Sequence, residues 1–324
     1  MQLETIYSLI KDKIKATERL MREELRSDVP VIHRMGTYIT QSGGKRIRPA
    51  VLCLSAKSCG YEGDKDVRFG VVFEFVHTAT LIHDDIIDNS DLRRGRRVMN
   101  KKFGTTLSIL FGDYLFNVAM EMALRDDDFR IVRLINKATD KMIQGEIIQS
   151  ERNYSADLSL DDYMDLIERK TAYVFASAAQ AAPILAGSGT KVEEEFFEYG
   201  MNLGIAFQLI DDYFDYASTE EKLGKPVGSD LREGKITYPI LTLLERSGKK
   251  PREVVKRCFD TRSVREEDLQ YLLTEMRECG ALEATKESAL QYASKAAKSL
   301  TLLEDSAYLD ALRELPVFVV ERNK

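Results

Sequence analysis

The sequence predicts an all-α fold: a single-domain bundle of long antiparallel helices around a deep central apolar cavity. Apolar residues recur at helical spacing along almost the whole chain, and the apolar–polar alternation of strands flanking Asn-Gly or Asp-Gly turns is missing. Glycine (19) and proline (7) are scarce among the 324 residues, which favours long regular elements over a turn-rich β architecture. No segment has the composition of a linker, so we expect one domain, residues 1–324, rather than two.

The expected helices follow one another along the chain. The first spans residues 5–21, where Ile6, Ile10 and Ile14 lie near one stripe. Six apolar stretches predict further helices, several of them apolar on all sides and therefore buried: residues 48–59, 68–88, 104–124, 128–150, 160–186 and 192–217. Residues 240–324 continue as shorter, more charged helices. Breaks are expected at 41–49, 89–97, 186–190 and 220–239, and three of these four segments are rich in Lys and Arg.

Composition excludes several classes of protein. A net charge of −6 argues against a nucleic-acid binder, which would normally present a basic face. The four cysteines form no C-x-x-C pair, so we expect reduced thiols in a cytoplasmic protein. The N-terminus has no signal-peptide core, and no apolar run is expected to reach the ~18 residues of a membrane span. We therefore expect a soluble protein with no stable membrane insertion.

The pattern D-D-x-x-D occurs twice, each time after Leu-Ile in a strongly apolar helix. Its six carboxylates are Asp84, Asp85, Asp88, Asp211, Asp212 and Asp215. Within each copy the first and third aspartates lie one helical turn apart on one face, and the second and third are spaced i, i+3, so the group offers hard oxygen ligands close together. A single copy is often just a solvated helix end, but two copies favour a Mg²⁺ site. Zinc is not expected, because the three histidines and four cysteines lack ligand spacing.

Basic residues gather in the predicted breaks. Lys45, Arg46 and Arg48 follow a Gly-Gly turn; Arg93, Arg94, Arg96 and Arg97 flank Gly95; Lys222, Lys225 and Lys235 lie in the last break. Lys170 and Thr171 stand inside an apolar helix, where a lone ammonium group would be costly without a partner. A Walker A sequence is absent. Each basic cluster alone is commonly a solvated patch, but together with two acidic motifs they indicate two diphosphate sites. One would be metal-bridged and the other held by Arg and Lys alone.

These motifs carry a family resemblance. In order they are "GGKRIRP", "HTATLIHDDIIDNSDLRRG", "GDYL", Gly145-Glu146, "KTA", "FQLIDDYFD" and "GKPVGSDLREGKITYP", and they cover residues 43–239. The set resembles the trans-polyprenyl diphosphate synthases, enzymes of the isoprenoid synthase fold. These enzymes extend an allylic diphosphate such as farnesyl or geranyl diphosphate with isopentenyl diphosphate. The resemblance also implies a homodimer, and residues 108–124 and 128–136 are apolar enough to pair between chains.

The resemblance implies a role for each matching residue. Asp84, Asp88 and Asp211 would ligate two or three Mg²⁺ ions per site, while Asp85, Asp212 and Asp215 would ligate or orient bound water. The allylic diphosphate would be contacted by Arg93, Lys170, Thr171, Gln208, Lys225 and Lys235. The isopentenyl diphosphate would be held by Lys45, Arg48, His77 and Arg94. The residues expected to carry catalysis are Asp84, Asp88, Lys170, Gln208 and Asp211.

Small residues before the first acidic motif suggest a long product. Ala79 and Thr80 lie one turn before Asp84, and Val76 lies a further turn down. In the family, aromatic residues at these positions close the pocket for short products, so an open tunnel is expected here, with Phe116 or Met120 as its floor. Small residues would equally permit close helix packing. The expected product is an all-trans chain of about the size of quinone side chains, with octaprenyl as the best single choice.

Several alternatives remain open at this point. A short-chain synthase making farnesyl or geranylgeranyl diphosphate would be favoured by bulk at positions 79 and 80. A terpene cyclase shares the ionisation step but needs no second diphosphate site. A non-catalytic partner subunit would be expected to lack some of the carboxylates or lysines, and none is missing. An all-α scaffold protein with acidic helix ends would need no basic clusters.

Overall fold

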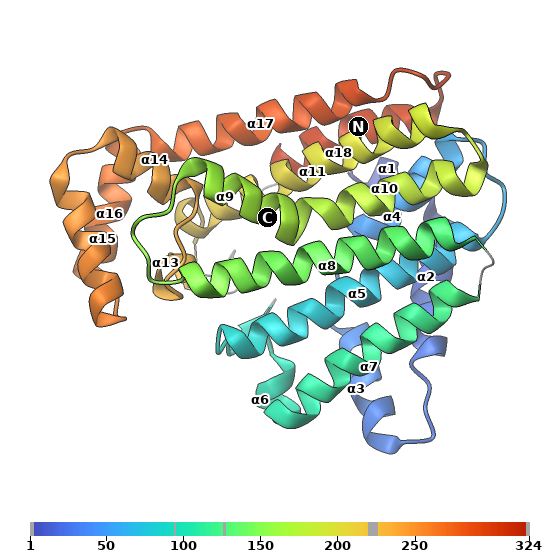
Figure 1. The fold of residues 1–324 in the computed structure, drawn as a ribbon, viewed down its shortest axis with the longest axis horizontal. Helices are drawn as coiled ribbons and strands as arrows, with labels where there is room; N and C mark the ends of the chain where they lie inside the picture. The colour runs from blue at the N-terminus through green and yellow to red at the C-terminus, as the bar shows by residue number, and fades with distance from the viewer. Residues whose placement is uncertain (1–2, 94, 126–127, 220–225, 322–324) are drawn as a thin grey trace.

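The computed structural model describes residues 3–93, 95–125, 128–219 and 226–321, and it confirms the all-α prediction (Figure 1). The first half of the chain forms α1 (Leu3–Ser8), α2 (Lys11–Glu24), α3 (Pro30–Gln41), α4 (Ile47–Ser58), α5 (Lys65–Ile87), α6 (Met99–Phe103), α7 (Thr105–Leu124) and α8 (Phe129–Arg152). The second half forms α9 (Leu160–Ile167), the π-helical turn η1 (Glu168–Ala172), α10 (Tyr173–Ala186), α11 (Thr190–Ala217), α13 (Ser229–Arg232), α14 (Tyr238–Arg246), α15 (Lys249–Thr261), α16 (Glu266–Glu278), α17 (Ala281–Ser299) and α18 (Ala307–Glu321). Lys225 and Arg94, which are predicted to contact the two diphosphates, lie outside the described residues.

The long helices form one bundle. Helix α11 packs against α10 and α17, α10 packs against α4 and α8, and α5 packs against α4 and α7. Figure 1 shows α17, α10 and α8 crossing the molecule with roughly aligned axes, with α8 antiparallel to α10 and α17. A continuous apolar core joins these helices and includes Phe73, Phe175 and Phe196, each completely buried.

A second, smaller core lies beyond the end of α11. Tyr216 from α11 packs there with Leu231 and with apolar residues of α14, α15 and α16. The segment between α11 and α14, which includes α13, is attached to this core through Leu231 and Ile236. The second core therefore fixes the loop that carries Lys235.

Besides helix α3, which was not predicted, and the π-helical turn η1, three local features differ from the sequence expectation. The first predicted helix is divided by a turn at Leu9 and Ile10, and Ile6 and Ile10 are both buried in the core. A two-stranded ladder, β1 (Leu92–Arg93) with β2 (Arg96–Arg97), stands where a plain loop was expected, and Gly95 adopts a positive φ of 72° between its strands.

The third difference concerns α7. Contrary to the expectation that no apolar run reaches a membrane-span length, residues 105–124 are long and apolar enough to cross a membrane by length and composition. One face of α7, including Phe111 and Leu115, is buried and belongs to the main core, as in a core helix of a bundle. The other face exposes Leu107 and Leu110.

Candidate active site

The first acidic motif lies at the C-terminal end of α5. Asp84 and Asp85 occupy its last turn and Asp88 is its C-cap, with Asn89 in the left-handed conformation that ends the helix. Three carboxylates at the negative end of a helix dipole are unfavourable unless cations lie nearby. Positively charged groups are therefore expected beside the C-terminal end of α5.

The second acidic motif lies in the last two turns of α11. The Asp212 carboxylate accepts hydrogen bonds from Tyr163 Oη at 2.5 Å and from Gln208 Nε2 at 2.8 Å, and Asp212 is almost fully buried. Asp215 is completely buried, and its side chain accepts a hydrogen bond from the backbone N–H of Asp230 at 3.1 Å. Asp211 is only partly buried. The motif thus divides into two carboxylates engaged by the protein interior and one at the edge of the site.

Two lysines face the first motif. Lys235 Nζ lies 2.8 Å from Asp88 Oδ2 and 2.7 Å from Glu233 Oε2. Lys170 Nζ lies 3.8 Å from Asp84 Oδ2 and donates a hydrogen bond to Gln149 Oε1 at 2.8 Å. Asp85 is paired instead with Arg93, whose Nε lies 2.9 Å from Asp85 Oδ1. Every carboxylate of the first motif therefore has a basic partner, as the helix dipole requires.

A π-helical turn places Lys170 and Thr171. The sequence predicted one continuous helix over 160–186, but η1 interrupts it at Glu168–Ala172, where the wider turn shifts the side chains around the helix. Thr171 Oγ1 donates a hydrogen bond to Gln208 Oε1 at 2.9 Å. Gly145 on α8 allows close approach, because a Cβ there would lie 2.9 Å from the Lys170 backbone nitrogen. The π-turn and Gly145 together bring Lys170 within reach of Gln149.

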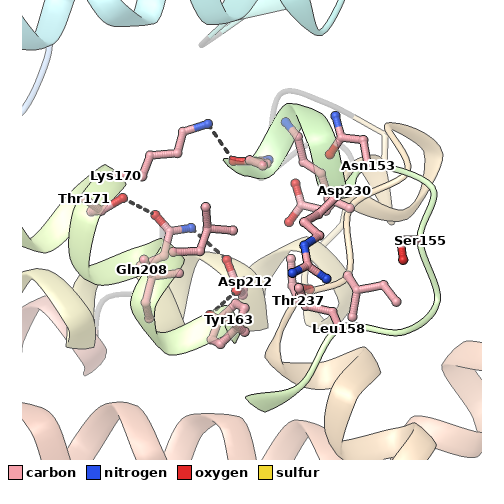
Figure 2. A pocket seen from close by; sticks show the side chains of 16 residues that line it. Asn153, Ser155, Leu158, Tyr163, Lys170, Thr171, Gln208, Asp212, Asp230 and Thr237 are labelled. Atoms are coloured by element: carbon pink, nitrogen blue, oxygen red, sulfur yellow. Dashed lines mark hydrogen bonds between the residues drawn. The ribbon is translucent and has the colours of Figure 1, made fainter. Parts of the chain in front are cut away.

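A cavity of about 130 Å³ lies beside these residues (Figure 2). Its polar lining includes Gln149, Arg152, Asn153, Ser155, Lys170, Thr171, Gln208, Asp212, Asp230, Lys235 and Thr237. Figure 2 marks the chain of hydrogen bonds that runs from Thr171 through Gln208 to Asp212 and Tyr163. Asp212 of the second acidic motif therefore lines the same cavity as Lys170 and Lys235.

Burial sets the charge states at the site. Burial raises the pKa of Asp84 to about 6, an effect that Lys170 opposes and that Glu146 and Asp88 reinforce. Burial together with the Asp230 charge raises the pKa of Asp212 to about 8, against the hydrogen bonds from Tyr163 and Gln208. Burial would lower the pKa of Lys235, but Glu233 and Asp88 raise it by more, so Lys235 remains an ammonium group. A cation bound beside Asp84 would stabilise the ionised carboxylate and so lower the pKa of Asp84.

The carboxylates fit a hard divalent cation. In the described part of the chain, no three acidic, His or Cys side chains already lie close enough together to hold a metal ion. However, Asp84 and Asp88 are partly exposed and each already interacts with a cation, the ammonium group of Lys170 or Lys235. Oxygen-only ligands with room for other groups are what Mg²⁺ prefers.

The residues expected at the second diphosphate lie on α4, α5 and the loop before α4. Lys45 is exposed, and Arg48 is buried with its guanidinium carbon 4.4 Å from the centre of the Phe175 ring. His77 is partly buried on α5, which packs against α4. His83, in contrast, turns toward α7, with Nε2 3.1 Å from the carbonyl oxygen of Ile109.

The proposed chain-length residues lie on α5 and α7, two helices that pack against each other. Val76 and Ala79 are buried on α5, Thr80 is partly buried, and Phe116 and Met120 on α7 pack against the main core. None of these five lines the cavity of Figure 2. The long apolar tunnel and its floor stay predictions.

Several residues of the site were missed by sequence reasoning. Glu146 and Gln149 contact Lys170 from α8, and Tyr163, Asp230 and Glu233 contact the acidic motifs or Lys235. Gly145-Glu146 was recognised as a motif but given no role. The i, i+3 spacing of Glu146 and Gln149 on a helix was the available signal, because it places two acceptors side by side.

Comparison with known proteins identifies related sequences and folds. The sequence model for "Polyprenyl synthetase" matches residues 29–276. The chain is 37% identical over 324 residues to the octaprenyl diphosphate synthase of Escherichia coli K12, covering 100% of both chains. It is 32% identical over 322 residues to heptaprenyl diphosphate synthase component 2 of Bacillus subtilis, covering 99% of this chain and 91% of that one. A crystal structure of a polyprenyl synthase from Caulobacter crescentus, complexed with calcium and isoprenyl diphosphate, superposes with a TM-score of 0.96 at 35% identity, covering 100% of this chain and 98% of that one.

Proposed function

Because this chain belongs to the polyprenyl synthetase family, we propose that it is a prenyltransferase that makes a long all-trans polyprenyl diphosphate. It condenses an allylic primer, farnesyl or geranyl diphosphate, head-to-tail with successive isopentenyl diphosphates. The observation that carries the proposal is the position of Lys170 and Lys235: both line the cavity together with Asp212 of the second acidic motif, and they lie 3.8 Å from Asp84 and 2.8 Å from Asp88 of the first. The names of the octaprenyl and heptaprenyl relatives support a long product, and octaprenyl remains our choice.

Asp84, Asp88 and Asp211 are the proposed ligands of two or three Mg²⁺ ions. The division of the carboxylates supports this assignment, since Asp212 and Asp215 are already engaged by the protein interior. Asp85, paired with Arg93, joins Asp212 and Asp215 in orienting bound water. When bound, Mg²⁺ supplies positive charge that stabilises the leaving diphosphate.

The chain's own residues bind and orient the allylic diphosphate. Lys170 and Lys235 supply ammonium groups, and Arg93, Thr171, Gln208 and Lys225 complete the proposed set. Stabilising the diphosphate as it leaves favours ionisation of the allylic C–O bond. Thr171 and Gln208 face the cavity with oxygen atoms that can soften the charge of the resulting allylic cation. The helices around the site exclude water, which would otherwise capture that cation.

The second diphosphate belongs to isopentenyl diphosphate and is held without metal. Lys45, Arg48, His77 and Arg94 are the proposed contacts. The double bond of isopentenyl diphosphate attacks the allylic cation, and the adduct loses a proton to the released diphosphate. No protein base is then needed, and the turn of His83 toward the Ile109 carbonyl agrees with this scheme.

We propose a cytoplasmic homodimer formed through α7 and α8. Large apolar side chains are exposed on these two helices: Leu107, Ile109, Leu110, Phe129, Ile143 and Ile147. An apolar surface of this kind favours burial against a second copy. Ile147, 63% exposed, is the residue to test. Ile147→Lys should shift the mass measured by analytical ultracentrifugation from dimer to monomer, and a monomeric wild type would refute the dimer.

The direct test of function is a turnover assay. The purified chain is incubated with Mg²⁺, farnesyl diphosphate and labelled isopentenyl diphosphate, and the product is sized by chromatography. Products of about seven to ten isoprene units are expected, and EDTA should abolish them. A single-addition product would refute the long-chain assignment, and no product at all would refute catalysis by this chain alone.

A further inference from the structure

The loop before α4 has an irregular backbone that side chains must hold in place. Gly43, Gly44 and Arg46 all have positive φ, at 69°, 153° and 49°. For arginine the left-handed region is uncommon and costs energy, so it persists only where the surroundings favour it. The same loop carries Lys45 and leads into Arg48, two of the residues assigned to isopentenyl diphosphate.

Arg46 points into the protein, unlike its exposed neighbour Lys45. Its Nη1 lies 2.8 Å from Glu74 Oε1, and the two side chains are 8% and 9% exposed. A buried ion pair is costly to break, because the remaining charge loses its compensation. The pair therefore fixes the left-handed turn at Arg46 to the middle of α5.

Tyr7 of α1 also contacts this loop. Its hydroxyl group donates a hydrogen bond to the backbone carbonyl of Lys45. Burial and the nearby Glu74 charge raise the pKa of Tyr7, with Arg46 opposing, so the phenol keeps the proton that it donates. Tyr7, Arg46 and Glu74 form one cluster, which we call the loop anchor.

We propose that the loop anchor is a positioning device for the isopentenyl diphosphate site, a role that rests on the proposed function. Glu74 lies three residues before His77 on α5, so both occupy one face of that helix. The ion pair thereby sets the loop of Lys45 and Arg48 against the helical turn of His77. Asp84 is ten residues further along α5, roughly 15 Å away at the helical rise. The loop anchor should therefore affect the second diphosphate and leave the metal-bridged one unchanged.

Three single variants and one double variant test the proposal. Glu74→Gln removes the charge and keeps the shape; Arg46→Asn removes the guanidinium with a residue that tolerates a left-handed backbone. Tyr7→Phe removes only the phenolic donor. The double variant Arg46→Asn/Glu74→Gln leaves no unpaired buried charge, in case a single change prevents folding. The control is Asp66→Asn at the start of α5, which removes the buried charge of another ion pair, with Lys13 at 2.7 Å.

Binding of isopentenyl diphosphate without Mg²⁺ is measured by calorimetry, and steady-state kinetics gives KM for each substrate. Glu74→Gln and Arg46→Asn should each weaken isopentenyl diphosphate binding about tenfold or more, since a hydrogen bond between charged groups is lost. KM for isopentenyl diphosphate should rise with it, whereas kcat and KM for farnesyl diphosphate should stay within about twofold. Tyr7→Phe should have a smaller effect in the same direction, and Asp66→Asn none.

Two results would overturn the positioning role. One is unchanged isopentenyl diphosphate binding in variants whose circular dichroism shows a folded chain. The other is an equal loss for both substrates, or an equal loss in Asp66→Asn, which would mark general destabilisation. A wild-type chain that neither binds nor consumes isopentenyl diphosphate would instead overturn the proposed function, and the positioning role with it.

Discussion

Lys235 Nζ lies 2.8 Å from Asp88 Oδ2, although 147 positions separate the two residues in the chain. Their side chains are 12% and 11% exposed, so solvent screens the pair little. The contact ties the loop held by the second core to the end of α5. It also places the ammonium group of Lys235 beside Asp88, a proposed ligand of Mg²⁺.

Lys235→Gln should make folding depend on Mg²⁺. Losing one member of a buried ion pair costs about 3–5 kcal/mol, because Asp88 keeps its charge without compensation. A metal ion beside Asp88 should restore part of that loss. Tm measured in EDTA and in Mg²⁺ should therefore differ more for the variant than for the wild type. Lys57→Gln is the control, since its partner Glu62 is 82% exposed. An equal Mg²⁺ effect in Lys235→Gln and wild type would contradict the prediction.

The raised pKa of Asp84 predicts how stability changes with pH. Its folded pKa is about 6, whereas the pKa of an unfolded aspartate is about 4. Between these values the folded chain binds more protons, so this group's contribution to stability is greatest at low pH and is lost as pH rises through 6. In EDTA, urea unfolding from pH 4 to 7 should show a smaller loss with rising pH for Asp84→Asn than for wild type. Identical pH profiles would show that Asp84 does not titrate in this window.

Gly145→Ala should disturb Lys170 while leaving its ammonium group in place. An added Cβ would meet the Lys170 backbone nitrogen at 2.9 Å and its Cβ at 3.0 Å, so α8 must move away from η1. Overpacking of this kind costs about 1–3 kcal/mol, and the lost contacts of Lys170 should lower kcat. Gly248→Ala is the matched control, because a Cβ at Gly248 meets nothing within 4 Å. Unfolding by urea and turnover are the measurements, and unaltered turnover in a folded Gly145→Ala would contradict the role of this close approach.

The fold and the acidic motifs could be predicted because their signals are local. Helical periodicity and the repeated D-D-x-x-D motif are both patterns formed by residues close together in the sequence. The π-turn at Lys170 could not be predicted, since it depends on how α8 packs against η1. It does not interrupt the helical spacing of apolar residues in the sequence. The buried bond from Tyr163 to Asp212 likewise depends on tertiary packing, because a tyrosine in an apolar helix resembles any other core residue. The single-domain organisation stays a prediction.

Ala79→Phe tests the predicted tunnel. Ala79 is buried on the face of α5 one turn before Asp84, so a phenyl ring there should block a growing chain early. The product should shorten by several isoprene units while the first condensation continues, as sized by chromatography. Ala79→Ser keeps the volume small and should preserve the long product. An unchanged product from Ala79→Phe would show that Ala79 serves only helix packing.

The central claim is that two diphosphates bind here in different ways, one through metal ions and one through side chains alone. Calorimetry with the wild-type chain tests this directly, using isopentenyl diphosphate and a farnesyl diphosphate analogue that cannot ionise, each with Mg²⁺ and with EDTA. We expect the allylic analogue to bind only with Mg²⁺ and isopentenyl diphosphate to bind equally well in both conditions. If both ligands required Mg²⁺, or if neither did, the division of the site into a metal-bridged and a metal-free half would be wrong.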